Sequence, residues 1–118
     1  MCSTNFFMSM SRQPIRSDDC NVAYAMSFIG GKWKIAIIWK LMDGRLRYSK
    51  LRAQLGAISE GVLIHQLKEL EADGLVQRID FREVPPHVEY ELTDQGRGLK
   101  KALQAVEVWG LDRRGSSK

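Results

Sequence analysis

The stretch that begins at Ser59 constrains the fold more than any other part of the chain. Leu63, Leu67 and Leu70 recur at i, i+4 and i+7, the spacing that places apolar side chains on one face of a helix. Ser59 is a preferred N-cap residue, and glycine, as at Gly74, is preferred just beyond a helix end. We therefore predict a helix between them, with its leucine face against a core and its other face polar.

A β-hairpin is predicted directly after this helix. Val88 to Leu92 alternates apolar and acidic residues, which indicates a strand with one buried face. Val76 to Arg82 alternates less regularly and is the expected partner strand, and Glu83 to His87 turns the chain between them. Leu46 to Tyr48 is too short to be more than a strand stub. Two short helices joined by a tight connection and followed by a hairpin are typical of a winged helix-turn-helix fold.

The expected architecture is mainly α with one small β-hairpin, an α+β arrangement. The predicted helices cover residues 22–28, 32–42, 50–55, 60–73 and 94–111. The expected capping residues are Asp18, Asp19 or Asn21 for the first helix, and Ser49, Ser59 and Thr93 for the last three. Trp33 and Trp39 are expected in the core rather than on a surface that stacks nucleobases.

The length of 118 residues is that of one domain, and 44% apolar residues are enough for a modest core. We expect a flexible leader over residues 1–17, the folded domain over 18–114 and a frayed tail over 115–118. No apolar run approaches the roughly 20 residues of a membrane span. The first ten residues lack the charged start and long apolar core of a signal peptide, so a cytoplasmic protein is expected.

Several classes of function find no support in the residue patterns. The soft metal ligands are Cys2, Cys20, His65 and His87, and none of them is paired at a zinc-site spacing. No Ser-His-Asp, Cys-His, paired-carboxylate or phosphate-loop pattern occurs. We therefore expect no metal, no cofactor and no enzymatic activity.

Basic residues are concentrated in one segment. Between Gly31 and Arg52, seven basic residues and the single acid Asp43 give a local net charge of +6, whereas the whole chain carries +4. A basic block on a folded element favours a polyanionic partner, although an ordinary solvated helix face has the same composition.

The polar face of the helix predicted over 60–73 is the candidate surface for reading double-stranded DNA, because a major groove is wide enough to admit it. The residues of this face, with its cap, are Ser59, Glu60, Gly61, Ile64, His65 and Lys68. Candidates for phosphate or minor-groove contacts are Arg47, Ser49, Lys50 and Arg52 around the preceding helix, and Arg78 and Arg82 on the hairpin. The segment from Glu60 to Leu75 carries a net charge of −3. An alternative interpretation therefore stays open, in which the winged helix binds a protein rather than DNA.

More than half of the chain, from Ile29 to Leu99, resembles the HxlR-type regulators, a branch of the MarR-like winged helix group. The segments that carry the resemblance are Gly30–Lys34, Asp43–Arg52, Ile58–Ser59, Gln66–Val76 and Glu83–Thr93. The resemblance implies a DNA-binding transcription regulator that works as a homodimer through its first and last helices. It also implies two recognition helices that read a pseudo-palindromic operator.

The apolar residues of the terminal helices are the candidates for the dimer interface. A terminal helix has little of its own domain to pack against, so it can bury these residues against a partner subunit. They are Val22, Met26, Leu99, Leu103, Val106 and Trp109. Three positions depart from the family pattern. Gly61 stands where a basic or amide residue is usual, Ile64 where a small polar residue is usual, and His87, at the wing tip, where arginine is frequent. Ile64 fits a thymine methyl group, and His87 joins the candidate DNA contacts.

Cys20 lies where the resembled family often has a cysteine, which implies a sensor of oxidants or small electrophiles. A thiol at a helix N-terminus gains from the helix dipole, which favours the thiolate. Asp18 and Asp19 oppose this effect by like charge. Cys2 is a candidate resolving partner, and an inert, partly buried cysteine is the alternative.

Overall fold

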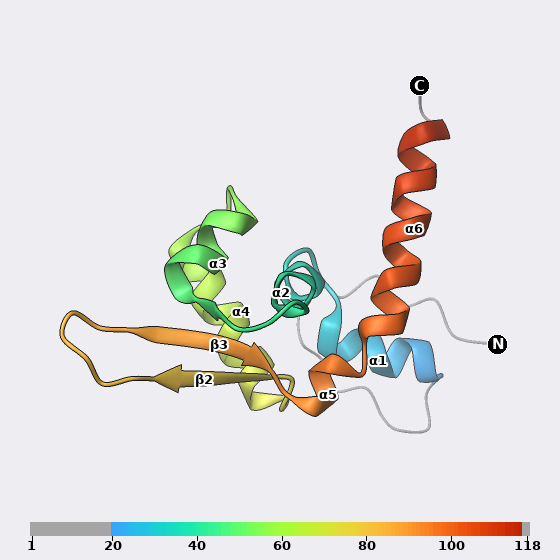
Figure 1. Cartoon of the computed structure of the whole chain (residues 1–118). Coiled ribbons are helices and arrows are strands. Elements are labelled where there is room, and N and C mark those ends of the chain that lie inside the picture. Colours follow the sequence, from blue (N-terminus) through green and yellow to red (C-terminus); the bar gives the residue numbers. More distant parts are fainter. Residues whose placement is uncertain (1–19, 117–118) are drawn as a thin grey trace.

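The computed structural model describes residues 20–116 (Figure 1). In chain order its elements are α1 (Asn21–Ile29), α2 (Lys34–Leu41), β1 (Leu46–Arg47), α3 (Tyr48–Leu55), α4 (Glu60–Ala72), β2 (Val76–Asp80), β3 (Val88–Leu92), α5 (Asp94–Arg97) and α6 (Lys100–Ser116). This is the predicted winged helix-turn-helix, mostly helical with a small antiparallel sheet. The hairpin extends from one end of the molecule, and α1 and α6 lie at the opposite end.

The sheet has the strand order β1-β3-β2. The hairpin pairs Val76 with Leu92 at its base and Asp80 with Val88 near its tip. The predicted stub is a true strand, because Leu46 lies opposite Tyr90 and pairs with β3 on its free side. The central strand of the wing is therefore bonded to the segment that leads directly into α3.

The core forms where α2, α3 and α4 meet one face of the sheet. Leu63, Leu67 and Leu70 of α4 are each at most 1% exposed, which confirms the leucine face. They pack in one cluster with Ile37 and Ile38 of α2. Trp33 and Trp39 are only partly buried, at the border of this cluster. The orientation of α4 is consequently fixed by apolar contacts on its inner side.

Two of the expected helix caps are confirmed. Ser59 Oγ accepts a hydrogen bond from the N–H of Val62 at 3.2 Å, and Thr93 Oγ1 accepts one from Gly96 at 3.2 Å. Gly74, with φ of 76°, follows α4 in the left-handed conformation, as predicted. These contacts satisfy amides that a helix start otherwise leaves without a partner.

Two other caps were predicted wrongly. The N-cap of α1 is Cys20, and Asn21 is already helical; Asp18 and Asp19 lie outside the described residues. The N-cap of α3 is Arg47, which makes no side-chain cap bond, and Ser49 lies inside the first turn. The physical reason is that pairing of β1 with β3 fixes the backbone up to Arg47, so the helix begins as soon as the strand ends.

The helix predicted over 94–111 is two helices. α5 ends at Arg97 with Gly98 as its C-cap, and α6 then continues through Ser116. Gly96 packs so closely on the start of β2 that an added Cβ would lie 2.3 Å from the carbonyl oxygen of Leu75. α5 is thereby fixed to the hairpin base, and α6 leaves it to project away from the body (Figure 1).

Among the described residues, no helix is long and apolar enough to cross a membrane.

Candidate nucleic-acid interface

The outer face of α4 gathers the predicted base-reading residues. All six are exposed on one side of the structure's fourth helix or at its cap: Ser59, Glu60, Gly61, Ile64, His65 and Lys68. Val62 also belongs to this face, with 40% of its surface exposed. The sequence did not predict this, because an apolar residue next to a leucine face is expected in the core. The face is therefore mixed, with one cation, one carboxylate and two aliphatic side chains.

A buried ion pair connects this helix to α2. Lys34 is 3% exposed, and its Nζ lies 2.7 Å from Glu69 Oε1. The other carboxylate oxygen of Glu69 lies 3.7 Å from Nε2 of His65, whose side chain is 68% exposed. A line of polar contacts thus runs from the core to the outer face of α4. Lys34 belongs to the basic block in sequence, yet it does not face solvent.

Other cations of the basic block remain on the surface. Arg47, Lys50 and Arg52 are exposed and make no ion pair with any described residue, and Ser49 is exposed between them. The first turn of α3 has no side-chain cap. Its free N–H groups and the partial positive charge of the helix start favour an anion there. The β1–α3 junction therefore presents a surface suited to phosphate.

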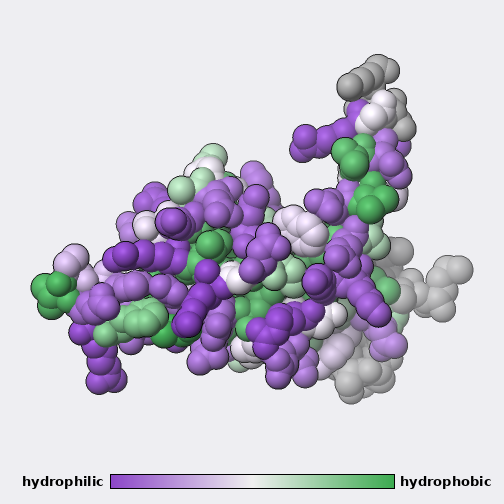
Figure 2. All heavy atoms as spheres, viewed as in Figure 1, coloured by the Kyte–Doolittle hydropathy of each residue, from purple (hydrophilic) through white to green (hydrophobic). Residues whose placement is uncertain are grey.

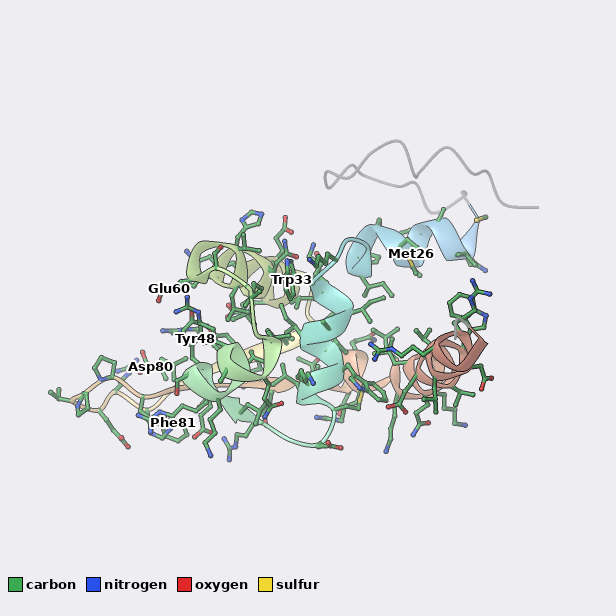
Figure 3. The ribbon with its side chains drawn as sticks, turned by 90° about the horizontal axis from the view of Figure 1, so that it is seen from above. Met26, Trp33, Tyr48, Glu60, Asp80 and Phe81 are labelled. Atoms are coloured by element: carbon green, nitrogen blue, oxygen red, sulfur yellow. The ribbon has the colours of Figure 1, made fainter. Side chains whose placement is uncertain are left out.

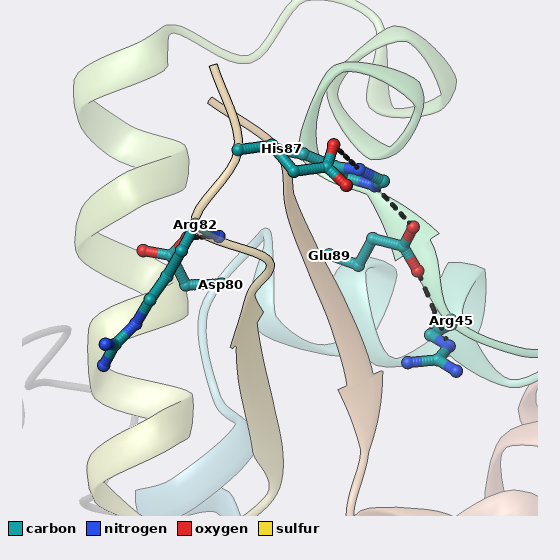
Figure 4. A network of polar contacts seen from close by, with 6 residues as sticks. Arg45, Asp80, Arg82, His87 and Glu89 are labelled. Carbon is teal, nitrogen blue, oxygen red and sulfur yellow. Dashed lines mark hydrogen bonds and ion pairs between the residues drawn. The ribbon is translucent and has the colours of Figure 1, made fainter. Parts of the chain in front are cut away.

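The wing carries two exposed arginines. Arg78 on β2 lies 3.8 Å from Asp80 through its Nη2 atom. Arg82, at φ of 54°, occupies the tip, where its backbone N–H donates to Asp80 Oδ1 at 2.8 Å. This bond leaves the Arg82 guanidinium outside the network drawn in Figure 4. Val84 beside it is 98% exposed.

The structure places His87 inside the wing rather than on its outer surface. Its Nδ1 lies 3.2 Å from Glu83 Oε2 and its Nε2 lies 2.7 Å from Glu89 Oε2. The ring stacks on Phe81 at 4.3 Å between centroids, and the side chain is 19% exposed. Both ring nitrogens face protein carboxylates, and a contact of His87 with DNA stays a prediction.

Two tyrosines line the junction between α3 and the sheet, with ring centroids 6.5 Å apart. The hydroxyl of Tyr48 is buried and has no hydrogen-bond partner among the described residues. Burial, and next the negative charge of Glu60, raise the pKa of Tyr48, while Arg52 lowers it. Tyr48 lies near the start of α4 (Figure 3). Burial raises the pKa of Tyr90 too, against a hydrogen bond with Arg78.

The terminal helices divide the predicted dimer residues into two groups. Leu103 is 4% exposed, and Met26 and Leu99 are partly buried against this chain's own core. Val22, Val106 and Trp109 are instead 59%, 55% and 67% exposed. Further exposed apolar residues that the sequence reasoning missed are Tyr24, Val108 and Leu111. Figure 2 shows hydrophobic side chains along the projecting helix.

Cys20 begins α1 as its N-cap. Its Sγ atom accepts a hydrogen bond from the N–H of Ala23 at 3.3 Å, and Cys20 is disulfide-bonded. Cys2, the expected resolving partner, lies outside the described residues. Within residues 20–116, no cluster of histidine, cysteine and acidic side chains is suited to a metal ion.

The family model of the HxlR-like helix-turn-helix matches residues 28–117. The chain belongs to this family. It is 44% identical over 94 residues to the regulatory protein MalR of Fusobacterium mortiferum, a match that covers 79% of this chain and 89% of MalR. It is 46% identical to the HTH-type transcriptional regulator BH0655 of Halalkalibacterium halodurans over 79% of this chain and 83% of that protein.

Among solved structures, the redox regulator HypR in its oxidized form superposes with a TM-score of 0.74 at 40% identity. That match covers 79% of this chain and 96% of HypR. The HxlR-like fold, with an outward polar face on α4 and a wing beside it, identifies the protein as a DNA-binding transcription regulator.

Proposed function

We propose that the protein binds a pseudo-palindromic operator as a homodimer in the cytoplasm, and that it has no enzymatic activity. The observation that carries the proposal is the outer face of α4, which is held rigidly by three buried leucines in the same small domain as the basic β1–α3 junction and the wing. Such a helix enters a major groove, while the β1–α3 junction and the wing reach the DNA backbone.

The contacts divide by chemistry. On the outer face of α4, Lys68 donates hydrogen bonds to base edges, His65 donates or accepts them, and Ile64 contacts a thymine methyl group. Phosphates are bound by Arg47, Ser49, Lys50 and Arg52 at the β1–α3 junction, and by Arg78 and Arg82 on the wing. Ser59, Glu60 and Gly61 start the helix close to the groove, where Gly61 leaves room for the bases.

The dimer is proposed from the exposed apolar residues at the end opposite the wing. Val106 and Trp109 fall on one face of α6, on the part of the helix that projects from the body. An isolated helix of this composition is marginal in water and is stabilised by packing against another surface. Val22 on α1 is a further exposed apolar residue at this end of the molecule.

Footprinting on the DNA that flanks the protein's own gene tests this proposal. We expect two protected half-sites about one helical turn, roughly 10 bp, apart. Sedimentation of Trp109→Ala with Val106→Ala should show weakened association. A wild-type monomer at micromolar concentration that still binds DNA one to one would contradict the dimer.

We further propose that Cys20 makes the regulator respond to oxidants or electrophiles. Its sulfur, disulfide-bonded in this structure, accepts the Ala23 N–H at the start of α1, where the helix dipole favours a thiolate once the disulfide is reduced. HypR, a relative at 40% identity, is a redox regulator. Two thiols lose two electrons and two protons to the oxidant as a disulfide forms. The disulfide or an adduct at the start of α1 then alters the spacing of the recognition helices through the dimer.

The test treats reduced wild type, Cys20→Ser and Cys2→Ser with diamide or a quinone, and measures operator affinity. Wild type should respond and Cys20→Ser should not. Cys2→Ser separates disulfide formation from direct alkylation, because only the quinone should still act on it. Equal responses of wild type and Cys20→Ser would exclude Cys20 as the sensor.

A winged helix that binds protein is the second candidate, and the net charge of −3 from Glu60 to Leu75 favours it. The dependence of binding affinity on salt concentration distinguishes DNA binding from protein binding. A DNA complex weakens steeply as salt rises because counterions are released, whereas an apolar protein interface does not.

A further inference from the structure

The tip of the wing is held by a chain of charged side chains centred on His87 (Figure 4). Glu83 from the turn and Glu89 from β3 each contact one ring nitrogen, at 3.2 Å and 2.7 Å. The second oxygen of Glu89 lies 3.5 Å from Nε of Arg45, just before β1. The chain of contacts therefore ties the turn to the sheet and the sheet to the segment that enters α3.

The chemistry of the ring decides what this arrangement requires. A neutral imidazole has one N–H and one lone pair, whereas an ionised carboxylate only accepts hydrogen bonds. Here a carboxylate oxygen lies at each ring nitrogen. A neutral ring donates a hydrogen bond to one of them, while the lone pair on its other nitrogen faces the second oxygen, and the two repel each other. Only the imidazolium donates to Glu83 and Glu89 at once, and such charge-assisted bonds are the strong ones.

We propose that His87 is a positioning residue for DNA binding, which as an imidazolium clamps the wing tip in the geometry that presents Arg82 to the DNA backbone. When the ring loses its proton, the contact to Glu83 is released and the tip becomes mobile. The inference rests on the proposed DNA contact of the wing and adds to it a dependence on pH.

The groups that face the ring come from three segments. Glu83 and the stacked ring of Phe81 belong to the turn, Glu89 belongs to β3, and Arg45 lies behind Glu89. Arg47 is paired with Glu89 in the strand register. Asp80 accepts the N–H of Arg82 on the other strand of the tip. No other histidine lies here, because the chain has only two and His65 is on α4.

The test measures operator affinity from about pH 5 to about pH 8, the range in which histidine changes charge. Wild-type affinity should fall with rising pH by about five-fold, at the lower end of couplings between linked groups. His87→Gln should have the lower affinity at every pH, and His87→Arg, a permanent cation, should keep the higher one. His65→Gln is the matched control, which changes affinity but keeps the part of the pH profile that belongs to the wing.

Glu83→Ala separates positioning from simple attraction to DNA. It removes a negative charge, so attraction alone predicts tighter binding, whereas loss of the clamp predicts weaker binding and a flatter pH profile. A His87→Gln profile that matches wild type, or tighter binding by Glu83→Ala, would overturn the inference.

A DNA-free measurement distinguishes failure of the inference from failure of the proposed function. Backbone ¹⁵N relaxation of Arg82 and Val84 should show a more mobile tip as pH rises in wild type, and an unchanging tip in His87→Arg. If this occurs without any operator binding, the clamp stands and the DNA contact fails. If the tip is equally ordered at all pH values, the clamp itself is wrong.

Discussion

The recognition helix and the wing tip are fixed in place by different kinds of contact. α4 is anchored by Leu63, Leu67 and Leu70, all at most 1% exposed. The wing tip has no such anchor, since Val84 is 98% exposed and the tip is held by the contacts of His87 with two carboxylates. Apolar burial involves no change of protonation and is not screened by salt, whereas charged contacts at a surface depend on both pH and salt.

This difference separates two tasks. A helix that reads bases has to keep one orientation, and burial of its inner face provides that. A wing that contacts the backbone tolerates movement, and its affinity can be adjusted by conditions. Variants of the two regions, from the largest expected effect to the smallest, test whether apolar burial anchors α4 and charged contacts hold the wing tip.

The largest effect is expected from Leu67→Ala. Truncation of a side chain at 1% exposure loses its transfer free energy and leaves a cavity, which costs about 3 kcal/mol of unfolding free energy. Ile64→Ala, on the outer face at 37% exposure, is the matched control and should cost well under half as much. Urea denaturation measures both. Equal losses would show that the leucine face does not anchor the helix.

A smaller loss of stability is expected from Lys34→Met. It leaves Glu69 without the ammonium 2.7 Å away, and because Glu69 keeps 24% exposure we expect about 2 kcal/mol, below the range for fully buried pairs. Lys40→Met on the same helix is the control. Lys34→Met combined with Glu69→Leu should recover most of the loss. If the single and double variants are equally unstable, the ion pair is not what Lys34 contributes.

The leucine face of α4 and Lys34 also show which parts of the fold could be predicted from the sequence and which could not. The leucine face is a local pattern, so helix α4 was predicted to within one residue, and the alternation of Val88 to Leu92 gave β3 with its observed bounds. Lys34 was counted with the surface cations, because its burial depends on a carboxylate far along the chain. Local periodicity finds an element, while long-range pairing decides which charges face solvent.

The candidate site also contains residues that local periodicity predicts and residues whose surroundings depend on the path of the chain. The outer face of α4 follows from the leucine face by geometry, so its six residues were grouped correctly on one exposed surface. His87 was predicted to contact DNA because the resembled family often has arginine at this position of the wing tip. Its ring is enclosed by Phe81, Glu83 and Glu89, and this depends on the path of the turn, which no sequence period encodes. The break between α5 and α6 lies at Gly98, next to the long-range contact of Gly96 with Leu75, which no sequence period encodes either.

At the level of DNA affinity, Lys50→Ala and Arg82→Ala should each weaken binding to all sequences and lower the salt slope by about 1, the mark of one lost phosphate contact. Lys101→Ala, an exposed cation on α6, is the control and should leave the slope unchanged. His65→Ala should instead change the preference among operator variants. An intact slope in Lys50→Ala or Arg82→Ala would contradict the assigned contact.

The smallest effect is expected where the two regions meet, at Tyr48. Its buried hydroxyl has no hydrogen-bond partner among the described residues, so Tyr48→Phe removes a desolvated polar group and loses no bond. We expect a gain of about 0.5 kcal/mol in unfolding free energy at pH 7. Tyr90→Phe is the matched control and should not gain stability, because the Tyr90 hydroxyl is not among the buried groups without a hydrogen-bond partner.

The pH dependence of the same variant gives an independent measurement. Burial raises the pKa of Tyr48 in the folded protein above its ordinary value of 10.0. The folded state therefore holds this proton more tightly than the unfolded state, and the associated stability is lost as pH rises from 10 through the folded pKa. Tyr48→Phe removes this contribution, so its advantage over wild type should widen above pH 10. A difference that stays constant into alkali would show that the Tyr48 hydroxyl is solvated.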